Sequence, residues 1–401
     1  MRILMIHNAY GRTSGEEAMF NRIAALLRSH DHSVECSCRS SAELTGLVGK
    51  SRAFFKGIYS FSSRAAMRRL LQENRPDVIY VQNVFPLISP SVLLEAHEHQ
   101  VAIVMRCANY RLICPNGLMM RRSSLCDECL GGREYRCMLH NCEGHLAKSI
   151  GYALRNYVAR KARFFLDTVT VYYCSTEFQR ERMIAEGFPA GRFDVIPNMV
   201  DCDDIAPSAG IGDYVGYAGR VSPEKGIQAL LAAAKGIPEV PFRIAGAYER
   251  MPHIVRQAPS NVEFLGNLDS TALDRFYRGC RILVLPSVWY ETFGLVLAEA
   301  AVRGKPVVSS RMGGLGEIVQ DGLTGLLCEP GEAVDLRKKL LYLWQRPQLC
   351  RQMGLAGRQK VLREYSPEVY YTRLMRVFQK AIEINGNGCN PEIEEPLACA
   401  K

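Results

Sequence analysis

The sequence predicts an α/β protein that consists of two domains, each built on a doubly wound parallel sheet. Short apolar segments alternate with longer amphipathic segments along almost the whole chain, a pattern typical of parallel strands joined by helices. The length of 401 residues favours two domains over one, and a hydrophobic content of 48% allows each domain its own core. The alternation stops once, in a stretch rich in Pro, Gly and Ser between residues 197 and 212, where we expect the domains to join.

The first half of the chain supplies one set of alternating elements. Each expected strand is a short apolar run, and each expected helix has apolar residues three or four positions apart. The expected strands are Ile3–His7, Val34–Cys38, Val78–Gln82, Ala102–Arg106, Val169–Cys174 and Phe193–Ile196. The expected helices are Glu16–Arg28, Ser63–Gln72, Pro90–His97, Lys148–Phe165 and Thr176–Ala185.

The second half repeats the same alternation. Its expected strands are Tyr214–Ala218, Phe242–Ala245, Val262–Phe264, Ile282–Leu285, Pro306–Ser309 and Gly325–Leu327. Its expected helices are Gly226–Lys235, Ser270–Gly279, Phe293–Arg303 and Val334–Trp344. Two such domains that face each other would bind a ligand in a cleft at the carboxyl ends of their strands.

These patterns give a division of the chain into four parts. We place a first domain at residues 1–198, with a cysteine-rich loop at 107–145, and a second domain at 199–365. A C-terminal helix at 366–384 is expected to pack back on the first domain, and residues 385–401 have the composition of a disordered tail.

Composition and charge narrow the classes of function. The sequence has no run of about 20 apolar residues, so no transmembrane helix is expected. The apolar run at the N-terminus is too short for a signal peptide, which favours a cytoplasmic protein. Residues 1–200 hold 26 Lys and Arg against 18 Asp and Glu, whereas residues 201–401 hold 24 against 23. The positive excess lies in the first half, so an anionic partner is expected to approach there.

The most informative motif is the pair of carboxylates at Glu291 and Glu299. An apolar strand ends just before Glu291, and an almost wholly apolar helix starts near Phe293. A helix start offers unpaired N–H groups and a partial positive charge, which suit phosphate. Glu299 lies two turns further along, roughly 9–12 Å from that end by the helical rise. Two unrelated surface glutamates are the alternative, but a charge on so apolar a helix needs a partner or a ligand.

A second motif follows the first strand of the second half. The segment from Gly219 to Gly226 contains a Gly turn, Arg220, Lys225 and the start of a helix. The two cations could converge on one anion in front of that helix. The segment lacks the Gly-Lys-Ser/Thr ending of a Walker loop. We interpret it as a diphosphate clamp, with solvated surface cations as the alternative.

Two further Gly-rich loops follow expected strands. The loop after the first strand contains Gly15, which would let the backbone approach a phosphate closely, although its spacing does not match a dinucleotide fingerprint. Another Gly-rich segment, at residues 311–319 and 321–326, follows the strand Pro306–Ser309. A Gly-containing loop alone is weak evidence in the first case, and structural turns are the alternative in the second.

Taken in order, these motifs resemble those of the retaining glycosyltransferases of family 4, which have the GT-B fold of two facing Rossmann-like domains. The resemblance covers residues 3 to 380 and is strongest in the second half. The motifs that carry it are Gly219-Arg220, Glu224-Lys225-Gly226, the Glu291/Glu299 pair, Gly304-Lys305-Pro306-Val307 and Asp321-Gly322-x-Thr324-Gly325. Each motif alone is weak, but their common order is specific.

The resemblance implies a site for a nucleoside-diphosphate sugar. Arg220 and Lys225 would bind the diphosphate and stabilise the leaving group, and Glu291 would contact the sugar hydroxyls; these three are the expected catalytic residues. The other expected donor-binding residues are Gly15, Gly219, Phe293, Gly294, Leu295 and Glu299. No cofactor is implied for catalysis, because the two cations would supply the electrostatic stabilisation.

One position departs from the family pattern. Such enzymes often carry a histidine after the fourth strand of the first domain, and Ala108 stands at that place here. Either Asn109 or Arg106 takes over on the acceptor side, or turnover is weak, or the chain has lost catalysis. The sequence leaves these alternatives open.

A cluster of cysteines stands apart from the cysteines in strands and helices. Cys126 and Cys129 form a Cys-x2-Cys pair inside a loop-like segment, and such spacing is typical of structural zinc sites. The candidate ligands are Cys114, Cys126, Cys129, Cys137 and Cys142. A redox-labile dithiol and incidental thiols are the alternatives.

Cations and aromatic residues are interleaved in two stretches of the first half, at 50–61 and 160–165. Such a surface fits an anionic membrane, where a lipid-linked acceptor would lie; ordinary solvated helices are the alternative. No nucleic-acid motif accompanies these residues, so nucleic acid is not expected as a partner.

The sequence therefore predicts a retaining hexosyltransferase, cytoplasmic or peripheral on the inner face of a membrane. It would move a sugar from a nucleoside-diphosphate sugar to a saccharide or lipid-linked acceptor, in the synthesis of a cell-surface polysaccharide. The rival prediction is a weakly active or inactive relative that binds nucleotide sugars and acts as a scaffold.

Overall fold

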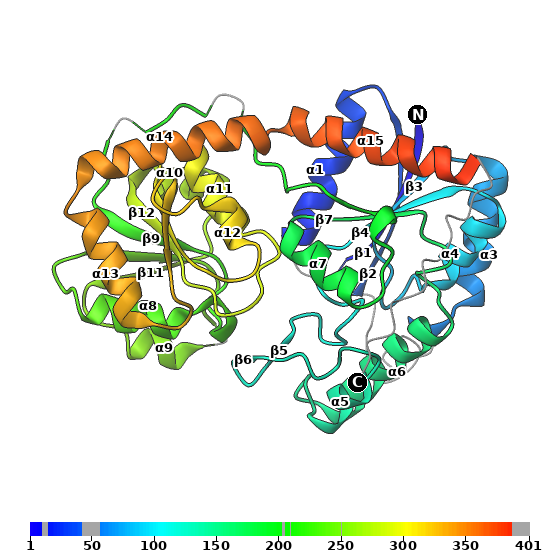
Figure 1. Ribbon diagram of the computed structural model, residues 1–401, viewed down its shortest axis with the longest axis horizontal. Helices are drawn as coiled ribbons and strands as arrows, with labels where there is room; N and C mark the ends of the chain where they lie inside the picture. The colour runs from blue at the N-terminus through cyan, green and yellow to red at the C-terminus, as the bar shows by residue number, and fades with distance from the viewer. Residues whose placement is uncertain (10–14, 42–56, 203–204, 209, 250, 387–401) are drawn as a thin grey trace. The chain divides into compact units, whose positions relative to one another are not determined.

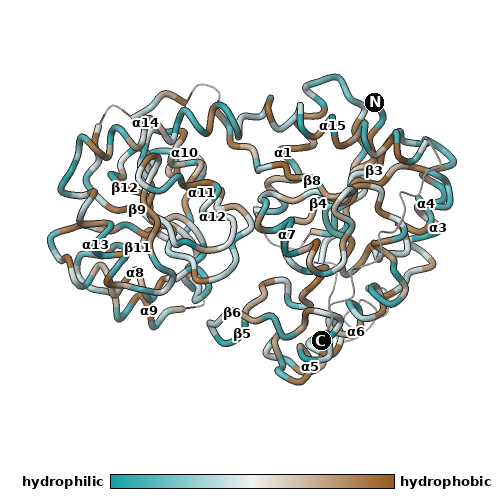
Figure 2. The backbone as a smooth tube through the Cα atoms, in the orientation of Figure 1, coloured by the Kyte–Doolittle hydropathy of each residue, from teal (hydrophilic) through white to brown (hydrophobic). Residues whose placement is uncertain are grey.

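The computed structural model describes residues 1–9, 15–41, 57–202, 205–208, 210–249 and 251–386. The chain forms two compact units (Figure 1). The first unit comprises Met1–Leu118, Asp127–Ile196 and the chain from Tyr371 onward, and the second comprises Met119–Cys126 and Pro197–Tyr370. Within each unit apolar residues concentrate in the strands and in the helix faces that cover them (Figure 2).

The first unit is built on a six-stranded parallel sheet with the order β2-β1-β3-β4-β7-β8. All residues of β3 and β4 are buried, because helices cover the central strands on both faces. The strands are β1 (Arg2–Ala9), β2 (Ser33–Ser40), β3 (Val78–Asn83), β4 (Ala102–Arg106), β7 (Val171–Cys174) and β8 (Phe193–Val195).

Helices connect these strands. Two of them start at side-chain caps, where Ser60 and Thr176 accept backbone hydrogen bonds. The helices are α1 (Gly15–Ser29), α3 (Phe61–Glu73), α4 (Ser91–Glu98), α5 (Tyr135–Leu139), α6 (Leu146–Lys161) and α7 (Glu177–Ala185). Helix α5 and the short antiparallel pair β5 (Met120–Arg121) and β6 (Ser124–Leu125) lie in the cysteine-rich segment, for which the sequence pattern predicts only a loop.

The second unit has its own six-stranded parallel sheet, with the order β11-β10-β9-β12-β13-β14. The strands are β9 (Tyr214–Ala218), β10 (Phe242–Ala245), β11 (Val262–Gly266), β12 (Cys280–Leu285), β13 (Val307–Ser310) and β14 (Gly325–Cys328). The helices are η3 (Pro223–Lys225), α8 (Ile227–Lys235), α9 (Pro252–Arg256), α10 (Ser270–Gly279), α11 (Leu295–Val302), α12 (Leu315–Ile318), α13 (Ala333–Trp344) and α14 (Pro347–Glu364).

Both sheets confirm the predicted fold class of two Rossmann-like α/β domains. In each sheet the strand order reverses at one point, between β1 and β3 in the first unit and between β9 and β12 in the second. Loops after such neighbouring strands run to opposite faces of the sheet and leave a crevice at the carboxyl ends. Each unit therefore has one place where its fold favours a ligand.

The last helix, α15 (Pro367–Gly386), joins the first unit from Tyr371 onward. The ring of Tyr371 stacks on His30 at a centroid distance of 3.6 Å, and Lys380 Nζ lies 2.8 Å from a carboxylate oxygen of Asp194. The predicted tail lies outside the described residues from residue 387 onward.

Candidate functional site

Charged side chains meet at the strand-order reversal of the second unit. Lys225 ends the short helix η3 that follows β9, and Glu291 lies in the loop that follows β12. Lys225 Nζ is 2.5 Å from Glu291 Oε1, and Ser287 Oγ donates a hydrogen bond to the same oxygen at 2.7 Å. The Glu291 side chain is buried, so its charge depends on these two partners. The structure thus brings two predicted catalytic residues together.

Glycine at position 226 makes this meeting possible. Gly226 has a φ of 72°, and a Cβ built on it would lie 1.7 Å from the carbonyl oxygen of Pro286. No other residue allows the loop after β9 to approach the loop after β12 so closely. The amide of Val288 donates to the carbonyl of Glu224 at 3.0 Å and holds the two loops in register. The requirement for glycine in the Glu224-Lys225-Gly226 motif is therefore steric.

Gly294 positions the start of helix α11 beside this pair. It has a φ of 89° at the N-cap position, and Phe293 before it is buried in the core of the unit. The helix begins at Leu295, so its positive end lies three to four residues after Glu291 in the chain. This confirms the predicted order of strand, Glu291 and helix start.

Arg220 is the second predicted cation, and it pairs with a different carboxylate. Its Nη2 lies 2.6 Å from Glu224 Oε1, and about half of its side chain is exposed. Burial by itself would raise the pKa of Glu224, but hydrogen bonds from Ser222 and the backbone, with the charge of Arg220, outweigh burial and lower that pKa. Both cations of the motif are thus neutralised by carboxylates in this structure.

Glu299 lies two turns along α11 and contacts the neighbouring helix. Tyr277 of α10 donates its hydroxyl hydrogen to Glu299 Oε2 at 2.7 Å. Burial, together with the nearby charge of Glu299, raises the pKa of Tyr277 well above its usual range. One carboxylate oxygen of Glu299 is thus oriented by the protein.

Trp289 belongs to the same loop as Glu291, and the sequence motifs do not single it out. Its side chain is largely buried, and its Nε1 has no hydrogen-bond partner in the described part of the chain. Lys225 Nζ lies 5.3 Å from the centroid of its ring. A buried N–H group without a partner is costly, which points to an acceptor atom supplied by a ligand.

The strand-order reversal of the first unit gathers neutral polar groups. Asn8 is a buried residue near the end of β1, and Asn83 ends β3. Asn83 Nδ2 donates to the carbonyl of Asn8 at 2.7 Å, and Asn8 Oδ1 accepts from the amide of Leu87 at 2.9 Å. These hydrogen bonds fix the backbone at the carboxyl ends of the two strands.

His7 is the unexpected residue of this region. Its ring is buried against Phe20, and neither ring nitrogen has a hydrogen-bond partner among the residues that the structure describes. Burial is the main cause that lowers the pKa of His7, and the nearby Arg106 lowers it further, while Glu16 and Glu17 oppose the shift. The neutral imidazole is therefore the favoured form. The only sequence signal was a polar residue inside an otherwise apolar strand.

The two predicted acceptor-side residues lie close to the same edge of the first sheet. Arg106, at the end of β4, donates from Nη1 to Gln82 Oε1 at 2.9 Å, and Gln82 donates to the carbonyl of Glu16 at 2.7 Å. Asn109 Nδ2 donates to Glu16 Oε1 at 2.7 Å. Both side chains are thus tied to the first turn of α1.

Gly15, by contrast, shows no steric need for glycine. It begins α1, and a Cβ built there would meet no atom within 4 Å. The rest of its loop, residues 10–14, lies outside the described residues, so its predicted approach to the donor stays a prediction.

The cysteine cluster forms a small buried group. Cys129, Cys137 and Ala153 pack together, with Met138 and Cys142 against them. Burial raises the pKa of Cys137 above its usual range, and the neighbouring thiols add to the shift. Within the described ranges, no set of three or more His, Cys, Asp or Glu side chains is arranged to hold a metal ion. The zinc site stays a prediction without support from this geometry.

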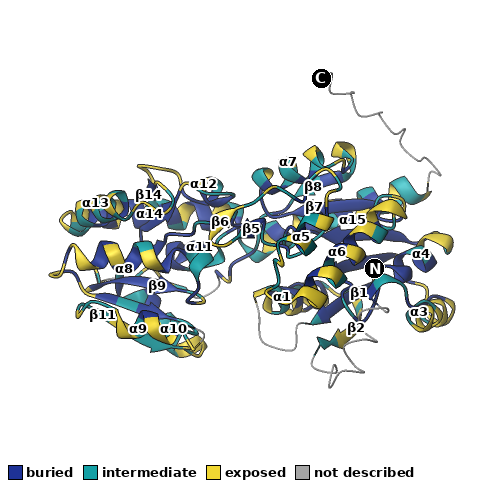
Figure 3. Ribbon diagram, turned by 90° about the horizontal axis from the view of Figure 1, so that it is seen from below, coloured by how far each residue is buried: buried dark blue, intermediate teal, exposed yellow. Residues whose placement is uncertain are grey.

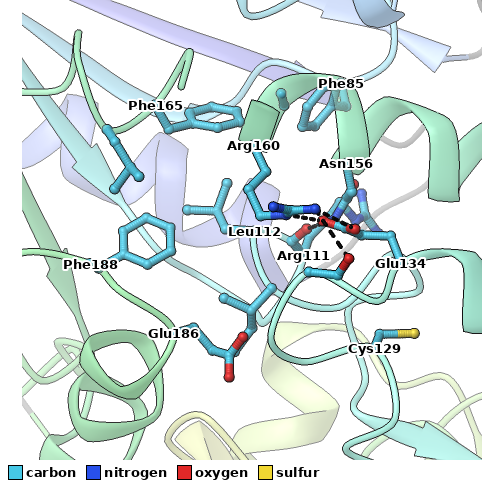
Figure 4. A pocket seen from close by; sticks show the side chains of 14 residues that line it. Phe85, Arg111, Leu112, Cys129, Glu134, Asn156, Arg160, Phe165, Glu186 and Phe188 are labelled. Atoms are coloured by element: carbon cyan, nitrogen blue, oxygen red, sulfur yellow. Dashed lines mark hydrogen bonds and ion pairs between the residues drawn. The ribbon is translucent and has the colours of Figure 1, made fainter. Parts of the chain in front are cut away.

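A pocket opens in the first unit beside α6 (Figure 4). Phe85, Phe165 and Phe188 supply apolar walls, and the labelled side chains of Arg160 and Glu134 meet across it in an ion pair. Burial raises the pKa of the Glu186 carboxyl, which accepts a hydrogen bond from the amide of Gly131 at 2.7 Å. The pocket combines apolar walls with polar groups that are already paired.

Two family models match the chain along most of its length. Residues 14–199 match the glycosyl transferase 4-like domain, and residues 207–360 match the glycosyl transferases group 1. Both halves of the chain thus match glycosyltransferase family models. Arg220, Lys225 and Glu291, which lie at the strand-order reversal of the second unit, fall within the residues that match the group 1 model.

The comparisons with individual proteins agree with this assignment. An uncharacterized glycosyltransferase, MJ1178 of Methanocaldococcus jannaschii, is 36% identical over 147 residues, which span 36% of this chain and 41% of that protein. The sucrose-phosphate synthase of Thermosynechococcus elongatus shares the fold with a TM-score of 0.71 and 16% identity, covering 95% of this chain and 99% of that one. The Anabaena protein Alr3699/HepE, solved with UDP and glucose, has a TM-score of 0.66 and 17% identity over 94% and 99% of the two chains.

No helix of the described residues is both long and apolar enough to cross a membrane.

Proposed function

We propose that this protein transfers a hexose from a nucleoside-diphosphate sugar to a saccharide or lipid-linked saccharide, with retention of the anomeric configuration. The observation that carries the proposal is the Lys225–Glu291 pair at the strand-order reversal of the second unit. A cation and a carboxylate that share one site suit the two ends of a sugar diphosphate. The UDP and glucose bound by the related HepE fold support the same donor class.

The donor would exchange partners with the residues that now neutralise one another. Its diphosphate would take Lys225 and Arg220 from Glu291 and Glu224, and the start of α11 would add its positive end. Glu291 would then accept hydrogen bonds from sugar hydroxyls, and Glu299, oriented by Tyr277, would accept from ribose hydroxyls. Trp289 Nε1 would gain the acceptor that it lacks among the described residues.

In the reaction, the bond between the sugar C1 and the diphosphate oxygen breaks, and a bond from the acceptor oxygen to C1 forms on the same face. The leaving diphosphate takes up the charge of the broken bond, and Lys225 and Arg220 stabilise it there. The proton of the attacking hydroxyl passes to the leaving phosphate oxygen. This route needs no base at position 108, where the chain has alanine.

The acceptor would bind the first unit, where Asn109, Arg106 and the neutral His7 lie close to the end of the sheet. The uncharged side chains of Asn109 and His7 fit the hydroxyls of a saccharide, and Arg106 adds a charged hydrogen-bond donor beside them. We place the reaction in the synthesis of a cell-surface polysaccharide on the cytoplasmic side of a membrane.

Calorimetry with UDP-, GDP- and ADP-sugars, followed by mass spectrometry of the products, tests this function. One sugar nucleotide should bind and be consumed, and NMR of the product should show the anomeric configuration of the donor. The variant Lys225→Ala should lose both signals, while Arg243→Ala, which removes an exposed ion pair with Glu263, should keep them. Binding without turnover against any acceptor or water would favour the rival function of a nucleotide-sugar-binding scaffold, which Ala108 also favours.

A further inference from the structure

Helices α5 and α6 carry an unusual concentration of exposed apolar side chains. Within the described ranges, fourteen large apolar side chains are exposed, and six of them fall between residues 135 and 157. The six residues, here called the docking face, are Tyr135, Leu139, Leu146, Ile150, Leu154 and Tyr157. Exposed segments run along both helices in Figure 3. Scattered exposed apolar residues are normal, but a group on one helix pair indicates a contact surface.

The amphipathic pattern of α6 is inverted relative to a helix of a soluble protein. Its larger apolar residues at positions 146, 150, 154 and 157 share one face by their spacing, and that face is exposed. The buried residues of the same helix are Ser149, Ala153, Arg155, Asn156 and Ala159. Hydrogen bonds hold the buried polar residues, such as that from Asn156 Nδ2 to the carbonyl of Arg111 at 2.7 Å. The exposed Leu and Ile side chains, by contrast, contribute favourable free energy only if a partner covers them.

The core beneath the helix pair does not compensate for this exposure. It consists of Cys129, Cys137 and Ala153, with two partly buried residues against them. These side chains are small, so this cluster buries little apolar surface between α5 and α6.

The charges around the docking face are mostly positive. Residues 133–163 contain seven Lys and Arg but only two Asp and Glu. The two acids pair with Arg160 and Lys148, and two acids just outside this range, Glu128 and Asp167, lie within 4 Å of Arg136 and Arg163. Arg155 is buried, and Arg133 and Lys161 form no ion pair among the described residues. The surface therefore keeps a small positive excess, which is complementary to an anionic surface.

The aromatic residues of the docking face lie next to cations. The guanidinium of Arg136 is 5.6 Å from the Tyr135 ring centroid, and that of Arg160 is 5.8 Å from the Tyr157 ring centroid. A tyrosine beside an arginine brings an apolar ring and a positive charge together on one surface. This combination is typical of side chains that lie in the headgroup region of a lipid bilayer.

We propose that α5 and α6 dock the protein on the surface of an anionic lipid bilayer, with the docking face in the headgroup and acyl boundary. The cations at 133, 136, 160 and 161 would contact lipid phosphates, and Leu and Ile side chains would enter the acyl layer. This surface differs from the basic stretch 50–61 that the sequence suggested, of which residues 50–56 lie outside the described residues. It overlaps the second stretch at Arg160 and Lys161, whereas Phe165 of that stretch is buried.

Vesicle flotation of the full chain tests the proposal independently of donor binding and turnover. The protein should float with vesicles of phosphatidylcholine and phosphatidylglycerol, and not with phosphatidylcholine alone, and added salt should weaken binding. The affinity of the double variant Ile150→Glu/Leu154→Glu for the anionic vesicles should be at least about tenfold lower, because charged side chains do not enter the acyl layer. Lys161→Glu should lower binding to the anionic vesicles without the loss of fold.

The matched control is Leu355→Glu/Leu362→Glu, which places two charges on exposed apolar positions of α14 in the other unit. It should float like the unchanged protein, and circular dichroism should show that both double variants fold. Equal flotation of the Ile150/Leu154 variant and the unchanged protein would overturn the proposal. So would a dimer that this variant splits in sedimentation, because the face would then bind a second copy of the chain.

Discussion

The two units have the same kind of sheet, yet their strand-order reversals carry different chemistry. In the second unit the crevice between β9 and β12 holds Lys225 and Glu291 in an ion pair. In the first unit the crevice between β1 and β3 holds Asn8, Asn83 and a His7 whose pKa is lowered by burial. The fold thus offers two equivalent places, and only the side chains decide what each can bind.

The difference corresponds to two different ligand groups. A diphosphate needs cations and a helix start, which the second unit supplies. A sugar hydroxyl needs uncharged hydrogen-bond donors and acceptors. Such groups in the first unit do not compete with the second unit for the diphosphate. The predictions below separate the two crevices in order of expected effect.

The largest effect is expected for Lys225→Ala in the second crevice. Loss of the cation leaves the buried Glu291 unpaired and removes the group that stabilises the leaving diphosphate. Transfer from the sugar nucleotide should fall by about 100- to 1,000-fold in kcat, by analogy with the loss of one transition-state donor. Initial rates measured with excess donor check this, and a rate within threefold of the unchanged protein contradicts the assignment of the crevice.

A smaller effect is expected for His7→Ala in the first crevice. The substitution removes a buried ring whose nitrogens have no partner within the described residues, so the lost group is one that a ligand could use. Acceptor kcat/KM should fall by about 10- to 100-fold, whereas the Kd of the nucleoside diphosphate should stay the same. Paired calorimetry and kinetics measure the two constants. A weaker nucleotide Kd would show that the crevices do not divide the work in this way.

Arg220→Gln should have a milder effect than Lys225→Ala, because the Arg220 side chain is about half exposed whereas Lys225 is largely buried. We expect about a tenfold loss in diphosphate affinity, in line with one charge-assisted hydrogen bond. Calorimetric titration of both proteins with the nucleoside diphosphate measures the change in Kd. Arg243→Ala again serves as the exposed-arginine control, since its partner is Glu263.

The smallest effect in the two crevices is expected for the pH dependence of the free energy of unfolding. The folded pKa of His7 lies below its usual value of 6.5, so the unfolded chain binds the proton more readily than the folded one. The stability contributed by the neutral ring is fully present above pH 6.5 and is lost as the pH falls toward the folded pKa, by at most about 1.4 kcal/mol per pH unit. Denaturant unfolding at several pH values should show this slope. His7→Phe should flatten it, and an unchanged slope would mean that another group titrates.

One further prediction concerns the stability of the first unit and a buried carboxylate that lies away from both crevices. Glu95 of α4 is fully buried and binds Arg64 and Arg68 of α3. Hydrogen bonds from Arg68 and then Arg64 outweigh burial and lower the pKa of Glu95 to about 2. Glu95→Gln removes these charged hydrogen bonds, but Arg64 keeps Glu98 and Arg68 is half exposed, so the first unit should lose about 2 kcal/mol of stability without a change in donor affinity.

Much of the second crevice could be predicted from the sequence because its residues are close in the chain. Gly219 to Gly226 form one loop, and Glu291 to Leu295 form another, so strand and helix patterns alone place them at strand ends. The sequence did not show that Arg220 pairs with Glu224 and that Lys225 pairs with Glu291. Which carboxylate neutralises which cation depends on loop contacts such as that of Gly226 with Pro286.

The first crevice was harder to predict because its residues come from distant segments. His7, Gln82 and Arg106 lie on three strands and meet only through strand pairing. A polar residue in an apolar strand gives no information about which neighbours face it. The inversion of α6 was hidden for a similar reason, because periodicity shows that a helix has an apolar face and not whether the protein core covers it.

The sequence by itself determined the two parallel sheets, their helices and the motif loops at the carboxyl ends of the strands. These follow from local periodicity and from glycine positions, which act over a few residues. Only the tertiary structure decided which charges are paired, that His7 is buried with no hydrogen-bond partner among the described residues, and that α6 turns its apolar face outward. Those outcomes depend on burial and on contacts between segments far apart in the chain, where desolvation and packing set the energies.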